Sequence, residues 1–234
     1  QGVFEPRCEM CGSESRSQPR LPPSVSIHSE DKAVEHTITP GTLAAHRVPG
    51  AKEKREVAQR LLQDSMDTSL YEDRGGACRI KRLPGVLGTH CLAFGECPGC
   101  SVARIRKPEP RQRFRGMLIE RELRTSSSSR PVRAVSIGCG GLLTDFECML
   151  GLWTRGCTIE SFVAIDTAYS SGGHDHGEYM QSLRAMAAFF SPCRVYSFSS
   201  SEDYIAAARR RPQIFGDATL FIHCDAGAVP DDQY

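Results

Sequence analysis

The sequence predicts an α/β fold built on a partial, doubly wound parallel sheet of about four strands. After Pro131, strand-like and helix-like segments alternate strictly as far as Cys224. The first strand-like segment, 132–137, runs directly into closely spaced glycines, which is typical of a tight turn between a strand and a helix. Strands that alternate with helices pair in parallel through right-handed crossovers. We therefore expect helices on both faces of the sheet and 132–137 as its central strand.

Each further element of this domain follows from its hydrophobic pattern. Short apolar segments predict strands at 132–137, 161–165, 194–198 and 217–224. Amphipathic segments predict helices at 142–155, 178–190 and 201–210. Ser200 or Ser201 is a suitable N-cap for the last of these helices. Trp153, near the end of the first helix, is expected in the core.

The residues before this domain have a different character. Residues 1–50 are rich in Pro, Ser, Arg and Gly without a sustained period, which predicts an irregular arm. The segment 53–71 predicts one amphipathic helix, because its apolar residues recur at helical spacing. The stretch 78–100 predicts turns and short strands, and 117–123 predicts a short strand or helix.

These elements suggest three parts of the chain. Residues 1–124 would form the irregular arm, the amphipathic helix and a cysteine-rich region. A Ser-rich linker at 125–131 would follow. Residues 132–234 would form the α/β domain.

Composition narrows the class of protein. The chain has 234 residues, of which 40% are hydrophobic and 24% charged, an ordinary globular composition. Its apolar runs are too short for a membrane-spanning helix, so we expect a chain that does not cross a membrane. The net charge of +1 conceals a basic segment, 104–124, with eight basic and three acidic residues. This segment could contact RNA, although a solvated or protein-facing stretch is the simpler interpretation.

The eleven cysteines do not resemble the paired framework of a small secreted domain, because their number is odd and they are spread over the chain. A reducing or organellar compartment fits them better. The sequence begins at Gln1 without an initiator Met or a secretory segment, so we expect either a removed targeting segment or a fragment. The expected location is intracellular and organellar, in a mitochondrion or chloroplast.

Two short cysteine motifs could bind zinc. Cys8 and Cys11, like Cys97 and Cys100, are separated by two residues, a spacing that lets both thiolates reach one tetrahedral ion. Together the two pairs would complete a four-cysteine zinc site. Free thiols or disulfides are the alternatives, and Cys78 and Cys91 could either substitute in the site or pair with each other. The other five cysteines lie in apolar sequence and are expected as buried hydrophobic residues: Cys139, Cys148, Cys157, Cys193 and Cys224.

The glycine turn carries a family resemblance. Ile137-Gly138-Cys139-Gly140-Gly141 resembles the first motif of class I S-adenosylmethionine-dependent methyltransferases, which have a Rossmann-type domain. The resemblance covers about residues 130–233. It implies that Gly138, Gly140 and Gly141 contact the cofactor and that Asp166, ending the second strand, binds the ribose hydroxyls. A carboxylate suits this role because it accepts two hydrogen bonds from a diol. Asp225, after the fourth strand, would contact the adenine or the substrate.

The sequence departs from this family in three places. The third glycine of the motif falls at Leu142, and the position that is often acidic in the family is Ser136. The chain also ends after the fourth strand, where the family's sheet has about three more. These departures predict an empty turn or weak cofactor binding, with the Leu142 side chain pointing either into the core or into the pocket.

A histidine-containing loop follows the second strand. His174-Asp175-His176 lies in a Gly-rich stretch at the expected carboxyl edge of the sheet, where α/β folds often bind ligands. Its imidazoles could transfer protons or bind a metal. A loop that simply leads into the next helix is the plainer interpretation.

Two functions are compatible with these features. The first is a non-catalytic structural or adaptor subunit of a larger organellar assembly, without catalytic residues and with other protein subunits as partners. Its arm and incomplete sheet would need cover from such partners, because an open sheet edge and an irregular arm are costly alone. The alternative is an S-adenosylmethionine-dependent methyltransferase that is a fragment of a longer chain. The sequence leaves the question of enzymatic activity open.

Overall fold

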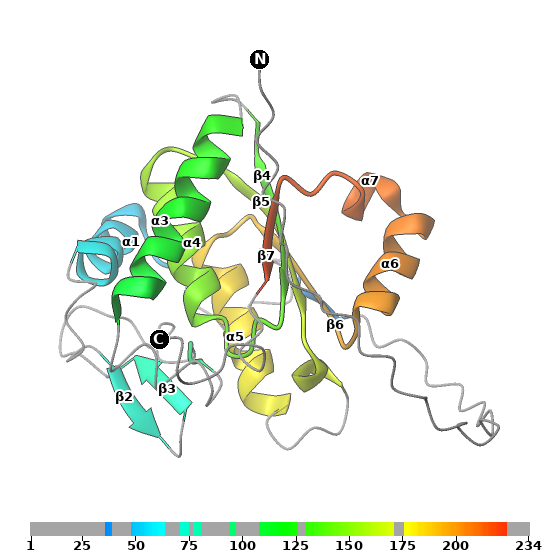
Figure 1. Cartoon of the computed structure of the whole chain (residues 1–234), viewed down its shortest axis with the longest axis horizontal. Helices are drawn as coiled ribbons and strands as arrows, with labels where there is room; N and C mark the ends of the chain where they lie inside the picture. Colours follow the sequence, from blue (N-terminus) through cyan, green and yellow to red (C-terminus); the bar gives the residue numbers. More distant parts are fainter. Residues whose placement is uncertain are drawn as a thin grey trace, which may run out of the picture. The chain divides into compact units, whose positions relative to one another are not determined.

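A computed structural model describes residues 36–38, 48–63, 71–74, 77–80, 94–96, 108–125, 130–170 and 176–223 (Figure 1). By its internal contacts the chain divides into two units, residues 1–32 and 33–234, and every described residue belongs to the second. None of the helices described there combines the length and apolarity needed to cross a membrane.

The second unit is an α/β domain with a five-stranded sheet that is mostly parallel. The strands lie in the order β1-β6-β5-β4-β7. Four of them are parallel: β4 (Val132–Ile137), β5 (Ile159–Ile165), β6 (Arg194–Phe198) and β7 (Leu220–His223). The four predicted strands are therefore confirmed, and β4 is an inner strand between β5 and β7.

The fifth strand corrects the sequence interpretation in two respects. β1 (His36–Ile38) pairs antiparallel with β6, so the sheet is mixed and β5, not β4, is its middle strand. The same three residues lie within the segment 1–50 that we expected to be irregular. Only the pairing with β6 marks them as a strand, since their own sequence has no detectable period.

The helices between the parallel strands also match the prediction closely. They are α4 (Leu143–Thr154), α5 (His176–Phe189) and α6 (Ser201–Arg210). The Ser200 side chain caps α6 by accepting a hydrogen bond from the Asp203 backbone N–H at 3.1 Å. Two short turns were not predicted, the 3-10 turn η5 (Thr167–Tyr169) and α7 (Pro212–Phe215).

The elements before the sheet differ more from expectation. The helix predicted at 53–71 begins as α1 (Ala51–Ala58) and continues as the π-helical turn η2 (Gln59–Gln63). Tyr71 instead opens β2 (Tyr71–Arg74), which pairs with β3 (Ala77–Ile80) in a separate two-stranded sheet. The short element predicted at 117–123 is part of a long helix, α3 (Pro108–Thr125), with two prolines in its first turn, where they are tolerated.

The sheet is covered on both faces. Helices α1, α3, α4 and α5 lie on one face, whereas α6 and α7 lie on the other (Figure 1). The larger core includes Val57, Leu61, Phe94 and Ile119 together with residues of the strands and of α4 and α5. The described segments before residue 125 therefore belong to the same packing unit as the α/β domain, and the stretch 125–131 does not separate two cores.

Lys54 shows how α1 is attached. The residue is only 8% exposed, and its ammonium nitrogen lies 5.9 Å from the Trp153 ring centroid and 5.6 Å from that of Phe189. Burial lowers the pKa of Lys54 from its ordinary value. The two rings offset part of that cost, because a cation is attracted to the face of an aromatic ring. Trp153, which was expected in the core, is partly buried and packs against it.

Candidate functional site

The glycine turn connects β4 to α4 at the carboxyl edge of the sheet. Gly138 and Gly140 have positive φ angles of 69° and 49°, which glycine adopts without steric cost. Leu142 also has a positive φ, 64°, which is unfavourable for a residue with a Cβ. Its side chain is fully buried in the core, so apolar burial offsets the strained backbone. Of the two orientations expected for Leu142, the structure has the one that points into the core.

Asp166 follows β5 and lies beside the turn, where the sequence placed it. One carboxylate oxygen accepts a hydrogen bond from the Gly140 backbone N–H at 2.8 Å, and the other accepts one from the Ala168 N–H at 3.0 Å. The carboxylate suggested for a ribose therefore holds the chain's own backbone and caps the turn η5. Because a carboxylate has about four acceptor positions, Asp166, which is partly exposed, keeps some capacity for another donor.

Two buried side chains, Cys139 and Tyr169, lie at the glycine turn and interact with each other. The Tyr169 hydroxyl donates a hydrogen bond to the Gly140 carbonyl at 3.1 Å, and the Cys139 sulfur lies 3.8 Å from that hydroxyl. Burial raises the pKa of the Cys139 thiol and of the Tyr169 phenol well above their ordinary values. Cys139 is therefore protonated at neutral pH and is not an activated nucleophile, because the thiolate is the reactive form.

A distant segment, Phe94–Glu96, closes the outer side of the turn. The Gly95 N–H donates to the Gly141 carbonyl at 3.0 Å, and the Gly95 carbonyl accepts from the Leu143 N–H at 3.1 Å. Leu143 is the first residue of α4, and its N–H is one of the donors that a helix N-terminus could offer to a ligand. In this protein the Gly95 carbonyl takes that donor.

Packing at this contact leaves no space for a larger residue. Phe94 is fully buried and stacks on Phe146 with ring centroids 4.1 Å apart. A Cβ atom added to Gly141 would lie 2.6 Å from the Gly95 carbonyl oxygen, which is far inside van der Waals contact. The absence of a side chain at Gly141 therefore allows the close approach of the chain's own segment 94–96.

A network of buried polar side chains anchors this segment and α3 to α4. Glu96 accepts a hydrogen bond from the Thr144 hydroxyl at 2.6 Å and lies 3.8 Å from the Arg111 guanidinium. Glu147 accepts one from the Tyr71 hydroxyl at 2.8 Å and lies 3.4 Å from Arg115. The sequence pattern did not predict this network, because its hydrogen-bonded partners are separated by 32 to 76 residues. The acidic residues within the apolar pattern of α4 were the sequence signal that could have indicated such a network.

Ser136, the position that is often acidic in the resembled family, is fully buried within β4. Its hydroxyl has no hydrogen-bond partner in the described part of the structure. The side chain lies on the same face as Ala134, toward α4 and α5, by the alternation of the strand. Position 136 thus supplies no carboxylate to an ammonium group.

The other predicted site residues lie largely outside the described residues. This applies to Cys8, Cys11, the Cys78 side chain, Cys91, Cys97, Cys100, His174, Asp175, the His176 side chain, Cys224 and Asp225. Within the described ranges no cluster of His, Cys, Asp and Glu side chains could hold a metal ion. Cys139, Cys148 and Cys193 are buried as expected, whereas Cys157 is partly exposed.

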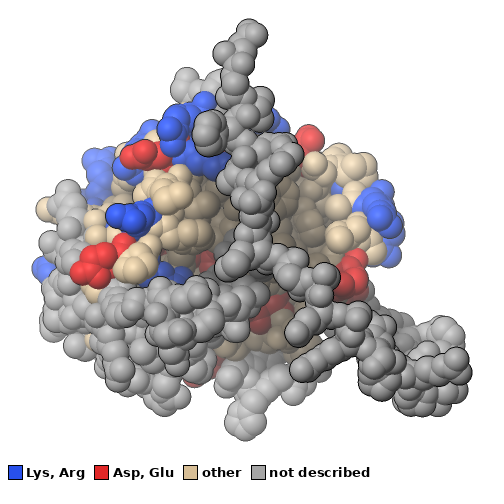
Figure 2. All heavy atoms as spheres, viewed as in Figure 1, with Lys and Arg blue, Asp and Glu red and all other residues tan. Residues whose placement is uncertain are grey.

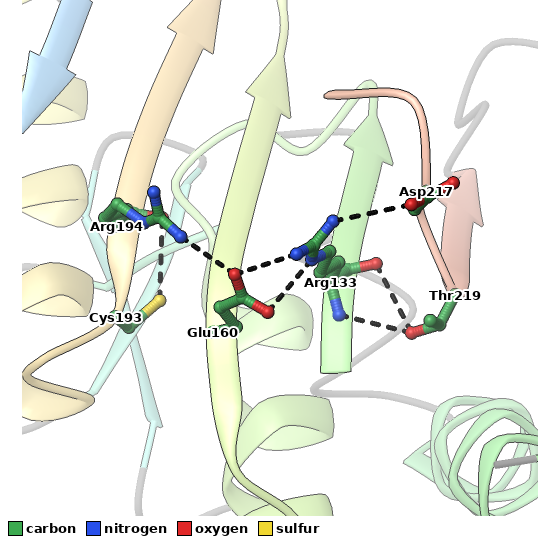
Figure 3. Close-up of polar contacts among 6 residues, drawn as sticks. All are labelled: Arg133, Glu160, Cys193, Arg194, Asp217 and Thr219. Carbon is green, nitrogen blue, oxygen red and sulfur yellow. Dashed lines mark hydrogen bonds and ion pairs between the residues drawn. The ribbon is translucent and has the colours of Figure 1, made fainter. Parts of the chain in front are cut away.

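The opposite, amino edge of the sheet has an ion-pair ladder that the sequence pattern also did not predict (Figure 3). Glu160 accepts hydrogen bonds from Arg133 at 2.9 and 3.0 Å and from Arg194 at 2.8 Å. Arg133 also lies 3.8 Å from Asp217. Glu160 reaches both arginines because β5 has an irregularity there: Val132 pairs with Ile159 but Arg133 pairs with Ser161, leaving Glu160 as the extra residue.

No family model matches the chain, and no curated protein or solved structure matches it significantly.

Proposed function

We propose that this protein is a non-catalytic structural or adaptor subunit of a larger organellar assembly. In this proposal its domain is a methyltransferase-like, Rossmann-type fold that no longer uses its cofactor turn. The parallel strands run in the order β6-β5-β4-β7, which is the third, second, first and fourth strand of the domain. That order is the one expected for half of a dinucleotide-binding or methyltransferase-like sheet.

The observation that best supports a non-catalytic role is the position of Gly95. Its carbonyl and N–H groups bond to Leu143 and Gly141, so it takes a donor at the N-terminus of α4 that a ligand could otherwise use. Asp166 is engaged by backbone N–H groups of the same domain. A cofactor that used the Leu143 N–H or the Asp166 carboxylate would first have to break these bonds, which lowers the gain from binding.

A second argument concerns the methionine end of the cofactor. Ser136 offers no carboxylate to its ammonium group, which removes a charge-assisted hydrogen bond worth about 1.5–3 kcal/mol. This corresponds to roughly a tenfold to hundredfold loss of affinity.

The proposal includes protein partners and a zinc site. The outer edge of β7 pairs with no other described strand, and Phe221 on this strand is 60% exposed. Such an edge is usually covered in a stable protein, so other subunits are the expected partners. Zinc bound by Cys8, Cys11, Cys97 and Cys100 would stabilise the N-terminal region, and the zinc content of the purified chain tests this part.

The alternative is an S-adenosylmethionine-dependent methyltransferase. Two observations favour it: the strand order and the position of Asp166 beside the glycine turn. In that case Gly138, Gly140 and Gly141 would contact the cofactor, and the closed segment 94–96 would have to move.

Calorimetry with S-adenosylmethionine distinguishes the two functions. We expect no binding, or a dissociation constant in the millimolar range, for the full chain and equally for Asp166→Ala and Asp217→Ala. Asp217 is 71% exposed at the opposite edge and serves as the matched control. A micromolar dissociation constant that Asp166→Ala abolishes and Asp217→Ala leaves intact would establish the methyltransferase alternative instead.

A further inference from the structure

The topology brings the first residues of the parallel strands and the last residues of the helices together at the amino edge of the sheet. The four parallel strands begin there, and α4, α5 and α6, which return antiparallel to the strands, end there. Helix α3, which precedes β4, also ends there. In Figure 1 this edge lies toward the top of the view.

Arginine dominates this edge. Its described segments are 121–125, 130–134, 154–161, 190–195 and 208–220, and they contain nine arginines, no lysine and three acidic residues, an excess of six positive charges. We call these arginines the arginine edge: Arg121, Arg124, Arg130, Arg133, Arg155, Arg194, Arg209, Arg210 and Arg211. Figure 2 shows basic atoms over the upper ends of α3 and α4 and over the upper part of α6.

Most of the arginine edge is exposed. Arg124, Arg130, Arg155, Arg209 and Arg210 are exposed and form no ion pair with any described residue. Arg194 shares Glu160 with Arg133 and still exposes 48% of its side chain. The guanidinium groups therefore present many hydrogen-bond donors to the outside.

Helix dipoles explain only part of this pattern. Basic residues are favoured at helix C-termini, which accounts for the arginines at the ends of α3, α4 and α6: Arg121, Arg124, Arg155, Arg209, Arg210 and Arg211. Arg130 and Arg194 instead stand at or just before the first residues of strands, where no helix dipole acts. Together these arginines leave an excess of six positive charges at one edge, which suits a ligand of opposite charge.

The chemistry of the edge distinguishes among anionic ligands. Guanidinium groups bind phosphates in a planar, two-bond geometry that lysine cannot supply, and this edge has arginine alone. Of the aromatic side chains in these segments, Phe190 and Phe215 are buried, and the exposed Phe221, which follows them on β7, is a single ring rather than a series on which successive unpaired bases could stack. Four strands at about 4.8 Å spacing span ~14 Å, along which a duplex presents about eight phosphate charges.

We propose that the arginine edge binds the phosphate backbone of double-stranded nucleic acid without reading its sequence. The inference goes beyond the proposed function and holds whether or not the glycine turn binds a cofactor. The proposal also changes which residues would contact RNA: the arginine edge takes the place of the basic segment 104–124 named in the sequence analysis. Arg111 and Arg115 of that segment are occupied inside the fold by Glu96 and Glu147, whereas its last two arginines belong to the edge.

Fluorescence anisotropy with the full chain tests the proposal. The probes are labelled double-stranded RNA and DNA of random sequence, single-stranded RNA and poly-glutamate, at 50 and 200 mM salt. The test variant, R124Q/R155Q/R209Q/R210Q, removes four exposed charges of the edge. The control variant, K52Q/R55Q/R60Q/R184Q, removes four exposed charges elsewhere. The double variant R209Q/R210Q covers the case in which the quadruple variant does not fold.

We expect the chain to bind duplexes more tightly than single strands, with affinity falling steeply as salt rises. The test variant should lose about tenfold or more in affinity, and its salt slope should fall by about four, one for each phosphate that is no longer neutralised. The control should stay within about twofold of the unmodified chain, and R209Q/R210Q should lie in between. Equal losses in test and control variants, or no duplex binding at 50 mM salt, would overturn the proposal. Equal affinity for poly-glutamate would also overturn the proposal and would indicate an acidic protein as the partner.

Discussion

The two edges of the central sheet differ in charge and in how their polar groups are used. At the carboxyl edge, the segments 138–145, 166–170, 176–180 and 199–203 contain five acidic residues and no Lys or Arg. Several polar groups there bond internally, to Gly95, Asp166 and Tyr169. At the amino edge, arginines predominate and most of them face solvent. Ligands of open α/β sheets usually bind at the carboxyl edge. The edge at which such folds usually bind ligands can thus have polar groups that bond internally, while the opposite edge exposes most of its charged groups.

The largest expected effect tests the closure of the carboxyl edge. Gly141→Ala places a Cβ 2.6 Å from the Gly95 carbonyl oxygen, a backbone atom that cannot rotate away. We expect a loss of about 2 kcal/mol in the free energy of unfolding, measured by urea denaturation. Gly116→Ala is the control, because no atom lies within 4 Å of its added Cβ. It should gain about 0.5–1 kcal/mol as a helix-interior glycine. Full tolerance of Gly141→Ala would mean that segment 94–96 does not dock there.

A smaller effect tests how the turn is supported. Tyr169→Phe leaves the buried Gly140 carbonyl without the hydroxyl that lies 3.1 Å away. We expect a loss of about 1–2 kcal/mol in the free energy of unfolding. The control, Tyr204→Phe, removes a part-buried hydroxyl that donates to the Phe215 carbonyl at 3.2 Å and should cost less. The reverse ranking of the two variants would contradict a supporting role for Tyr169.

The smallest effect belongs to the amino edge. Hydrogen bonds from Arg133 hold the pKa of Glu160 below its ordinary value. Glu160 therefore binds fewer protons in the folded chain than in the unfolded chain. Its contribution is fully present above the unfolded pKa of about 4.3 and is lost as pH falls through the lower, folded pKa. At pH 7 Glu160→Gln should cost about 1 kcal/mol, because the three side chains are partly exposed.

The pH dependence separates the ladder from an ordinary surface pair. The difference in stability between the native chain and Glu160→Gln should shrink in acid titrations followed by circular dichroism. The matched control is Glu56→Gln, whose carboxylate lies 3.9 Å from the exposed Lys52. The stability difference caused by Glu56→Gln should depend much less on pH. Equal pH profiles for the two variants would contradict a stabilising role for the Glu160 ion pairs.

Local sequence predicted much of the α/β domain. The alternation after Pro131 identified four strands and three helices, since each buries a face with its own period. The position of Asp166 beside the glycine turn also followed, because neighbouring parallel strands end at the same edge. These features depend on residues close in sequence or on general rules of strand pairing.

Features that depend on distant partners could not be predicted in this way. Gly95 gives no sign in the sequence that it docks on Leu143, 48 residues later. Strand β1 has only three residues and is defined by its pairing with β6. Helix α3 was underestimated because its buried positions are set by α4, including the place where Ile119 packs against Gly151. The Glu160 bulge likewise depends on its two arginine partners rather than on the pattern of β5.

Leu142 also limits which substitutions this turn can accept. Its left-handed backbone costs about 1–2 kcal/mol, which glycine would relieve. Its fully buried side chain contributes more than that, since removing a core leucine side chain costs about 2–5 kcal/mol. The single substitution Leu142→Gly would therefore destabilise the chain. Stability alone thus opposes a third glycine in this turn, and such a glycine could be introduced only together with changes in the surrounding core that would fill the volume of the Leu142 side chain.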